Sequence, residues 1–169
     1  MKKTVLFFRL GAAACFAVIL FSCKKSSTAN NIVTPAAAFT FKVDGGAAIT
    51  ADSANALLYN LPGAGGREMD VYVYKAGAQI LEFHFSPVTG NKAASTTLGG
   101  AGYAFLTYDS SPVNSWDGQS GALNLTTCDT TGNNIIGDFN FVGKEYPYTG
   151  SAVKTITEGH MVVTKLTRM

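Results

Sequence analysis

Two histidines, His84 and His160, are the residues of this chain best suited to acid–base chemistry. His84 lies in the alternating run QILEFHFS (79–86), which follows the alternating run MDVYVYK (69–75) after a short connection. If the two runs pair as a hairpin, Asp70 lies opposite His84, and a His–Asp pair belongs to the machinery of serine hydrolases. No serine, however, sits in the G-x-S-x-G context of a nucleophile elbow. We therefore interpret the pair as a cross-strand polar contact and expect no catalytic residues and no enzyme.

The spacing of the histidines does not indicate a metal site either. Neither histidine belongs to a ligand-spaced cluster with cysteines or carboxylates. The stretch DTTGNN (129–134) looks superficially like a calcium loop but lacks the bidentate glutamate of an EF-hand, and a hairpin with Gly132 and Asn133 at the special backbone positions explains it more simply. Cys128 is expected to be partly exposed, with nothing nearby to activate it. We expect no metal and no cofactor.

Aromatic side chains leave one opening for ligand binding. Tyr72 and Tyr74 share the outer face of their expected strand, and Trp116 lies in the loop-like stretch SSPVNSWDGQSG (110–121). Exposed aromatic rings can stack on sugars or peptides, which makes these three residues a candidate ligand-binding surface. Trp116 could equally close one end of the core.

The elements that position these residues are expected to be strands. From Phe39 onward the dominant period is two, with glycine and polar turns between the runs, and no stretch is convincingly helical. This spacing predicts an all-β fold, an antiparallel β-sandwich or a flattened β-barrel of about eight or nine strands. SANALLYN (53–60) is ambiguous and could be a helical turn, and LPGAGGRE (61–68) reads as a loop. The expected strands are 39–43, 47–52, 69–75, 79–86, 103–109, 122–129, 135–143, 152–157 and 160–166.

The hydrophobic pattern predicts the register of one hairpin. A two-residue turn would set Val71 opposite Glu82 or His84, and a slip of one residue turns every side chain to the other face. A three-residue loop over 76–78, with Gly77 in the left-handed region, instead sets the apolar residues of 69–73 opposite those of 81–85. Asp70 then lies opposite His84, and Tyr72 opposite Glu82, on the outer face of the sheet.

The first 22 residues have the form of a lipoprotein signal peptide. Three basic residues precede an uncharged run of 12, Leu10–Phe21, which is short for a membrane span but suitable for a signal-peptide core. The run ends in Leu20-Phe21-Ser22-Cys23, which resembles a lipobox, although Phe21 is bulkier than usual. Cleavage before Cys15 would leave the hydrophobic segment FAVILF near the N-terminus of the mature protein, so Cys23 is the better lipid-attachment site. An incidental cysteine in a secreted protein and an uncleaved anchor helix are the alternatives.

The chain then divides into a lipidated cysteine with a flexible linker (23–35) and a single all-β domain (36–169). Cleavage removes 3 of the 13 basic residues and none of the 11 acidic ones, which changes the net charge from +2 to −1. No basic patch remains, so we expect no nucleic-acid partner. With Cys15 removed and Cys23 acylated, Cys128 has no partner for an intrachain disulfide. We expect a monomer.

Several motifs together resemble a family of uncharacterised Bacteroidota lipoproteins. They are a V-D-G turn at 43–45, a G-x-L-x-L strand at 121–125, a D-T-T hairpin at 129–131, a G-x-F-x-F strand at 137–141 and an I-T-x-G motif at 156–159. Met161 stands where the family tends to have phenylalanine, a tolerable exchange in a core. The family has no assigned activity, so the resemblance supplies no catalytic residues.

The resemblance implies an outer-membrane lipoprotein. Surface-exported members tend to carry acidic residues just after the cysteine, and the segment after Cys23 has none, so we expect the domain to face the periplasm rather than the cell surface. It also implies O-glycosylation at short Asp-Ser/Thr sites, of which Ser53 and Thr130 are the candidates.

Taken together, the sequence predicts a lipid-anchored cell-envelope protein whose domain is a non-enzymatic binding or scaffold module. Its partners would be the membrane, through acyl chains on Cys23, and a glycan or an envelope protein. One alternative is a glycan-binding or glycan-degrading protein; a retaining glycosidase needs two carboxylates about 5 Å apart, for which Asp70, Glu82 and Asp117 are the candidates. The other is a carrier of a small apolar ligand, which requires an under-filled barrel.

Overall fold

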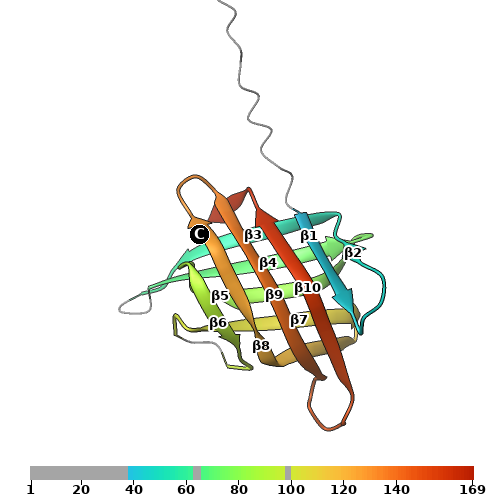
Figure 1. Cartoon of the computed structure of the whole chain (residues 1–169). Helices are drawn as coiled ribbons and strands as arrows, with labels where there is room; N and C mark the ends of the chain where they lie inside the picture. The colour runs from blue at the N-terminus through green and yellow to red at the C-terminus, as the bar shows by residue number, and fades with distance from the viewer. Residues whose placement is uncertain (1–37, 63–65, 98–99) are drawn as a thin grey trace, which may run out of the picture. The chain divides into compact units, whose positions relative to one another are not determined.

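The computed structural model describes residues 38–62, 66–97 and 100–169, and all regular elements in these ranges are strands (Figure 1). The all-β prediction is therefore confirmed. In the described part, no helix is long and apolar enough to cross a membrane. The strands are β1 (Ala38–Val43), β2 (Ile49–Thr50), β3 (Ser53–Asn60), β4 (Arg67–Lys75), β5 (Ala78–Phe85), β6 (Gly90–Ala94), β7 (Tyr103–Ser111), β8 (Asn114–Asp129), β9 (Asn134–Glu145), β10 (Val153–Val163) and β11 (Leu166–Arg168).

The 11 strands form one sheet in the order β11-β3-β4-β5-β7-β6-β8-β9-β10-β1-β2. The sheet curls over, so that the half containing β8, β9, β10 and β1 crosses in front of the half containing β3, β4, β5 and β7 (Figure 1). The long strand β8 belongs to both halves, because it pairs with β7 and β6 on one side and with β9 on the other. The expected antiparallel arrangement is wrong at two places: β11 runs parallel to β3, and β6 runs parallel to β7.

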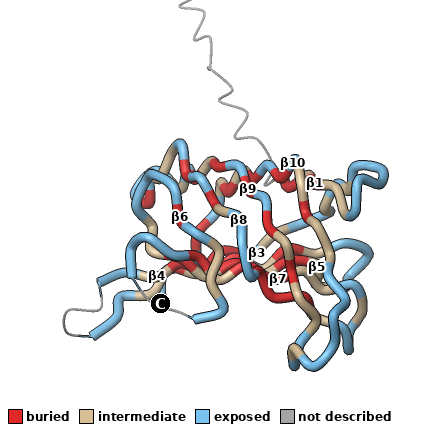
Figure 2. The backbone as a smooth tube through the Cα atoms, turned by 60° about the horizontal axis from the view of Figure 1, so that its bottom comes forward, coloured by how far each residue is buried: buried red, intermediate tan, exposed pale blue. Residues whose placement is uncertain are grey.

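The core lies between the two halves of the curled sheet, where Figure 2 shows the buried segments. Phenylalanines from both halves meet there. The ring of Phe83 in β5 lies 6.0 Å from that of Phe39 in β1 and 5.0 Å from that of Phe139 in β9, measured between centroids. Each of these three rings is at most 2 % exposed. Burial of large aromatic side chains dominates the stability of such a core.

Several element boundaries differ from the sequence prediction. The ambiguous segment 53–60 is a strand, because Leu58 and its alternating neighbours face the core. The stretch 90–94 forms the unexpected β6, and residues 114–121 continue β8 instead of forming a loop. The expected strands 152–157 and 160–166 are largely one strand, β10, interrupted by a bulge at which Glu158 has a positive φ of 51°. A bulge hides a strand from period-two analysis because it shifts the alternation by one residue.

The hairpin of β4 and β5 has the predicted register, with Val71 opposite Phe83 and Asp70 opposite His84. The predicted three-residue loop is wrong. The turn has two residues, Ala76 and Gly77, both at positive φ, and a bulge at 80 supplies the missing one-residue shift. The backbone N–H of Ala76 donates to the carboxylate of Asp52, which holds this alanine in the turn.

The motif residues serve the packing of β8, β9 and β10. Phe139 and Phe141 face the core as expected. Gly137 permits a close approach, since a Cβ there would lie 2.8 Å from the carbonyl oxygen of Asn124 on β8. In the 129–134 turn only Asn133 has a positive φ, of 57°, so the expectation for Gly132 is wrong.

Candidate functional site

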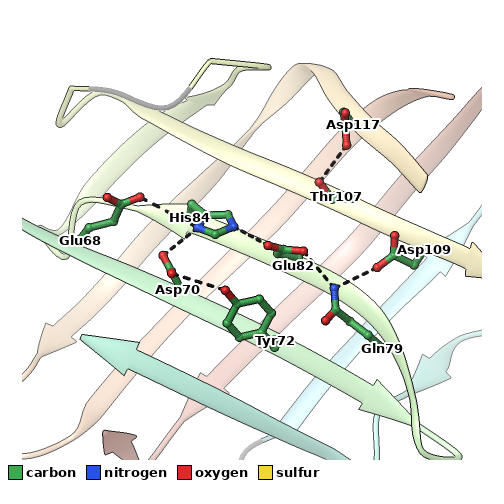
Figure 3. Close-up of polar contacts among 9 residues, drawn as sticks. All are labelled: Glu68, Asp70, Tyr72, Gln79, Glu82, His84, Thr107, Asp109 and Asp117. Atoms are coloured by element: carbon green, nitrogen blue, oxygen red, sulfur yellow. Dashed lines mark hydrogen bonds and ion pairs between the residues drawn. The ribbon is translucent and has the colours of Figure 1, made fainter. Parts of the chain in front are cut away.

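A network of polar side chains covers the outer face of β4, β5 and β7, with His84 at its centre (Figure 3). Nδ1 of His84 lies 2.7 Å from Oδ1 of Asp70, and Nε2 lies 2.6 Å from Oε1 of Glu82. The imidazole is 14 % exposed, and the Asp70 and Glu82 side chains are 12 % and 26 % exposed. The ring is therefore fixed between two carboxylates in a partly dehydrated setting.

The alternation of β4 brings a third carboxylate to this cluster. Glu68, Asp70 and Tyr72 follow one another at every second position, so they share the outer face. Oε1 of Glu68 lies 4.0 Å from Nδ1 of His84. The sequence missed Glu68 because 61–68 was assigned to a loop, whereas β4 begins at Arg67. The spacing of residues in the sequence gives no sign of this cluster, because its members come from two strands that pair in the fold.

The charges in the cluster shift the protonation of its members. Burial alone would lower the pKa of His84, but hydrogen bonds and charges from Glu82 and Asp70 outweigh it and raise that pKa, which favours the imidazolium. The hydrogen bond from His84 lowers the pKa of Glu82. Burial, followed by the charges of Asp70 and Glu82, raises the pKa of Tyr72 to about 12.

The network extends from Glu82 toward β7. The side-chain amide of Gln79 donates to Glu82 at 3.0 Å and to Asp109 at 3.1 Å, so one nitrogen joins the two carboxylates. Burial raises the pKa of Asp109. The sequence did not single out Asp109, which lies one strand further along the sheet and is separated from Gln79 by 30 residues.

The three carboxylates considered for glycoside hydrolysis do not form one group. Asp70 and Glu82 both contact His84, as described above. Asp117 is buried elsewhere, where Thr107 donates to its Oδ1 at 3.0 Å and the Tyr148 hydroxyl donates to its Oδ2 (Thr107–Asp117 is drawn in Figure 3). Asp117 therefore has a structural role in holding β7 and β8 together with the turn that carries Tyr148.

A groove of about 520 Å³ lies beside the His84 cluster, and we call it the tyrosine groove. Tyr72 and Tyr74 supply its aromatic rings, Asn55 and Gln79 supply amides, and Thr167 supplies a hydroxyl. Its remaining lining residues are Ala54, Ala56, Leu57 and Lys165. Ligand pockets commonly span about 300–1,000 Å³, so the groove is large enough for a small ligand or one unit of a longer one.

Tyr72 connects the groove with the cluster. Its ring meets the imidazole of His84 edge-on, with centroids 6.1 Å apart and planes at 90°. Its hydroxyl lies 3.5 Å from Oδ2 of Asp70. A ligand stacked on Tyr72 would therefore contact a ring that is itself held by the polar network.

Trp116 is not part of this surface. It is 6 % exposed, on the inner face of β8 opposite Tyr108, and its Nε1 donates to the hydroxyl of Ser110 at 3.0 Å. Nζ of Lys154 lies 5.8 Å from the ring centroid. Trp116 is therefore a packed side chain and no exposed platform, and the candidate binding surface reduces to Tyr72 and Tyr74.

The remaining candidate residues are distributed as follows. Ser53 is exposed, whereas Thr130 is buried at 9 % exposure, so the folded domain has room for a glycan only at Ser53. Cys128 is half-buried, and burial raises the pKa of its thiol, in line with an inert cysteine. Cys23, the expected lipid-attachment site, lies outside the described residues.

The arrangement can do two things chemically: stack and hydrogen-bond a polar ligand in the tyrosine groove, and hold positive charge among Glu68, Asp70 and Glu82. Comparison with protein-family models, with curated proteins and with solved structures finds no match for this chain.

Proposed function

We propose that this protein is a lipid-anchored cell-envelope lipoprotein whose domain is a non-enzymatic binding module, with a glycan as its ligand. The observation that carries the proposal is the tyrosine groove. Tyr72 and Tyr74 stand two positions apart on one face of β4, and amide and hydroxyl groups from Asn55, Gln79 and Thr167 line the same depression. Sugar rings present apolar faces for stacking and hydroxyls for hydrogen bonding, which is the combination that these side chains complement.

A glycan-array screen on the purified protein tests the binding role. We expect a specific set of glycans to bind, and Tyr74→Ala to weaken that binding by about tenfold or more, since a stacked aromatic ring is a typical binding hot spot. Tyr74 is the better probe than Tyr72 because it lies outside the hydrogen bonds of the His84 cluster. Tyr103→Ala is the matched control, since Tyr103 is 53 % exposed and outside the groove. Equal loss in both variants would contradict the groove as the binding site.

The anchoring part of the proposal rests on the residues around Cys23 and on the resemblance to Bacteroidota lipoproteins. We expect radiolabelled palmitate to mark the protein and Cys23→Ala to release it from the membrane fraction, because acyl chains supply the membrane affinity. A Cys23→Ala protein that stays in the membrane pellet would contradict the anchor. We also propose an outer-membrane location facing the periplasm; protease treatment of intact cells should then leave the domain uncut.

A glycan-degrading enzyme is the second candidate, and one observation favours it. The Gln79 amide joins the carboxylates of Glu82 and Asp109, and burial keeps Asp109 protonated more readily than a free aspartate, as a general acid requires. Any glycan that binds should therefore also be incubated with the protein, and its products analysed. Turnover that Asp109→Asn abolishes would establish this candidate over the binding module. Binding without turnover would contradict the enzyme and favour the non-enzymatic binding module.

A further inference from the structure

His84 has the surroundings of a metal ligand. One oxygen from each of Glu68 and Asp70 and one nitrogen of His84 all lie within 4.8 Å of one another. Their side chains are 26 %, 12 % and 14 % exposed, so the group is partly shielded from water and open on the Glu68 side. We propose that Glu68, Asp70 and His84 form a binding site for one divalent transition-metal cation, with Zn²⁺ as the preferred ion because it combines imidazole and carboxylate ligands.

The distances require only small adjustments. Zinc bonds of about 2.0–2.1 Å in a tetrahedral site place neighbouring ligand atoms about 3.3 Å apart. Nδ1 of His84 lies 2.7 Å from Oδ1 of Asp70 and 4.0 Å from Oε1 of Glu68. The first gap must widen and the second must close, each by about 0.6–0.7 Å. Rotation of the partly exposed Glu68 side chain would close the second gap, and a small rotation of the Asp70 carboxylate would open the first. Water would take the fourth position, as in open zinc sites.

The second ring nitrogen of His84, Nε2, is hydrogen-bonded to a carboxylate, as is common for histidines that bind metals. Nε2 of His84 lies 2.6 Å from Oε1 of Glu82, and Oε2 of Glu82 accepts from Gln79 at 3.0 Å. A carboxylate behind a metal-bound imidazole fixes the ring and increases its basicity. With Nε2 held by Glu82, the nitrogen that faces Glu68 and Asp70 is Nδ1. An incoming cation would replace the proton on Nδ1, and that proton would pass to solvent. The hydrogen bond between His84 and Asp70 would be exchanged for bonds from Nδ1 and Oδ1 to the cation.

Charge balance also favours a cation here. Glu68, Asp70 and Glu82 carry three negative charges when ionised, against one positive charge on a protonated His84. In the described part of the chain, no lysine or arginine forms an ion pair with any of these carboxylates. Carboxylates gathered in a partly buried position repel one another, and a divalent cation among them offsets that repulsion.

Zinc binding to the full-length protein tests the site. The protein is purified from membranes in detergent with an affinity tag that contains no histidine, treated with a chelator, and dialysed against graded free Zn²⁺. We expect one Zn²⁺ per chain and at least tenfold weaker binding in His84→Gln. His160→Gln is the matched control, because His160 also lies 2.8 Å from an aspartate, Asp138, but with side chains 47 % and 63 % exposed and no second carboxylate in ion-pair distance in the described residues.

Further variants keep the proposal falsifiable if His84→Gln folds poorly. Glu68→Gln removes the most exposed ligand, and we expect it to weaken zinc binding while the urea unfolding midpoint stays near that of wild type. Glu82→Ala should weaken binding about 10-fold through the ring that it positions, with partial recovery in Glu82→Gln. Visible absorption of bound Co²⁺ reports directly on the ligands and should be lost in His84→Gln. Equal zinc binding by wild type and the folded ligand variants, or none by wild type, would overturn the proposal. The result does not depend on whether the tyrosine groove binds a glycan.

Discussion

The backbone of Gly159 in β10 lies directly against Phe139 in β9, and a Cβ at Gly159 would collide with both the ring and the carbonyl oxygen of Phe139. Phe139 is a core residue that touches the rings of Phe41 and Phe83. The glycine of the I-T-x-G motif therefore has a packing reason, since only hydrogen fits between the strand and a ring that cannot move without disturbing the core.

We expect Gly159→Ala to lower the free energy of unfolding by about 1–3 kcal/mol or more, as overpacking in a filled core does. Urea unfolding followed by circular dichroism measures the change. Gly102→Ala is the control, because a Cβ there meets no atom within 4 Å, and it should shift stability by less than about 0.5 kcal/mol. If Gly159→Ala were as stable as the control, β9 and β10 would have to be able to shift and make room for the added methyl group.

The hydrogen bond from Tyr148 to Asp117 should make stability depend on alkaline pH. Burial, aided by Asp117, raises the pKa of Tyr148 from 10.0 to about 12. Between these values the unfolded chain loses this proton while the folded chain keeps it, so the wild type loses stability as the pH rises through that window. Tyr148→Phe lacks this titration. It should be less stable than wild type by about 1 kcal/mol at neutral pH, and the difference should shrink toward pH 12.

The unfolding midpoint in urea, measured at several pH values, checks this prediction. Tyr103→Phe is a suitable control, because Tyr103 is 53 % exposed and should follow the wild-type curve. A constant difference between wild type and Tyr148→Phe across the window would contradict the assigned role of Asp117.

Lys92 should be a destabilising residue at neutral pH. It lies on the inner face of β6 opposite Leu123, is 1 % exposed, and donates to the carbonyl oxygen of Ala101 at 3.0 Å. Burial lowers its pKa. We expect Lys92→Met to raise the free energy of unfolding by about 1 kcal/mol, because it keeps the volume and removes a buried charge. Lys92→Ala should lower it, because the buried methylenes are lost.

The pH dependence of this effect has a definite sign. The folded state releases the Lys92 proton more easily than the unfolded state, so wild type gains stability relative to Lys92→Met as the pH rises toward 10.5. Lys165→Met, at an exposed position, should show neither effect. Equal stability of Lys92→Met and wild type at every pH would show that the ammonium group reaches water.

Trp116 is the only tryptophan and provides a spectroscopic test of the fold. At 6 % exposure its fluorescence should be blue-shifted and several-fold less sensitive to acrylamide than that of the urea-unfolded chain. Because Trp116 is buried and does not line the groove, glycans should bind without quenching it. Strong quenching by acrylamide in the folded protein would contradict the packing of β8 against the core.

The sequence predicts strand pairing best where one face of each strand is apolar. Val71 and Phe83 pair as expected, because a slip of one residue would turn every apolar side chain to the other face, and the same register places Asp70 opposite His84. The prediction fails where the alternation breaks, as at the bulge around Glu158 and in the polar β6, which contributes Lys92 to the inner face. Glu68 and Asp109 joined the site only through strand pairing, since neither has a recognisable spacing from His84.

The parallel pairing of β11 with β3 has a consequence for aggregation. Leu166 pairs with Ala56, and the backbone N–H of Met169 donates to the carbonyl of Leu58. Without residues 166–169, the backbone groups on the outer edge of β3 would be free to pair with strands of other chains. A variant truncated before residue 166 should therefore aggregate more readily than the intact domain.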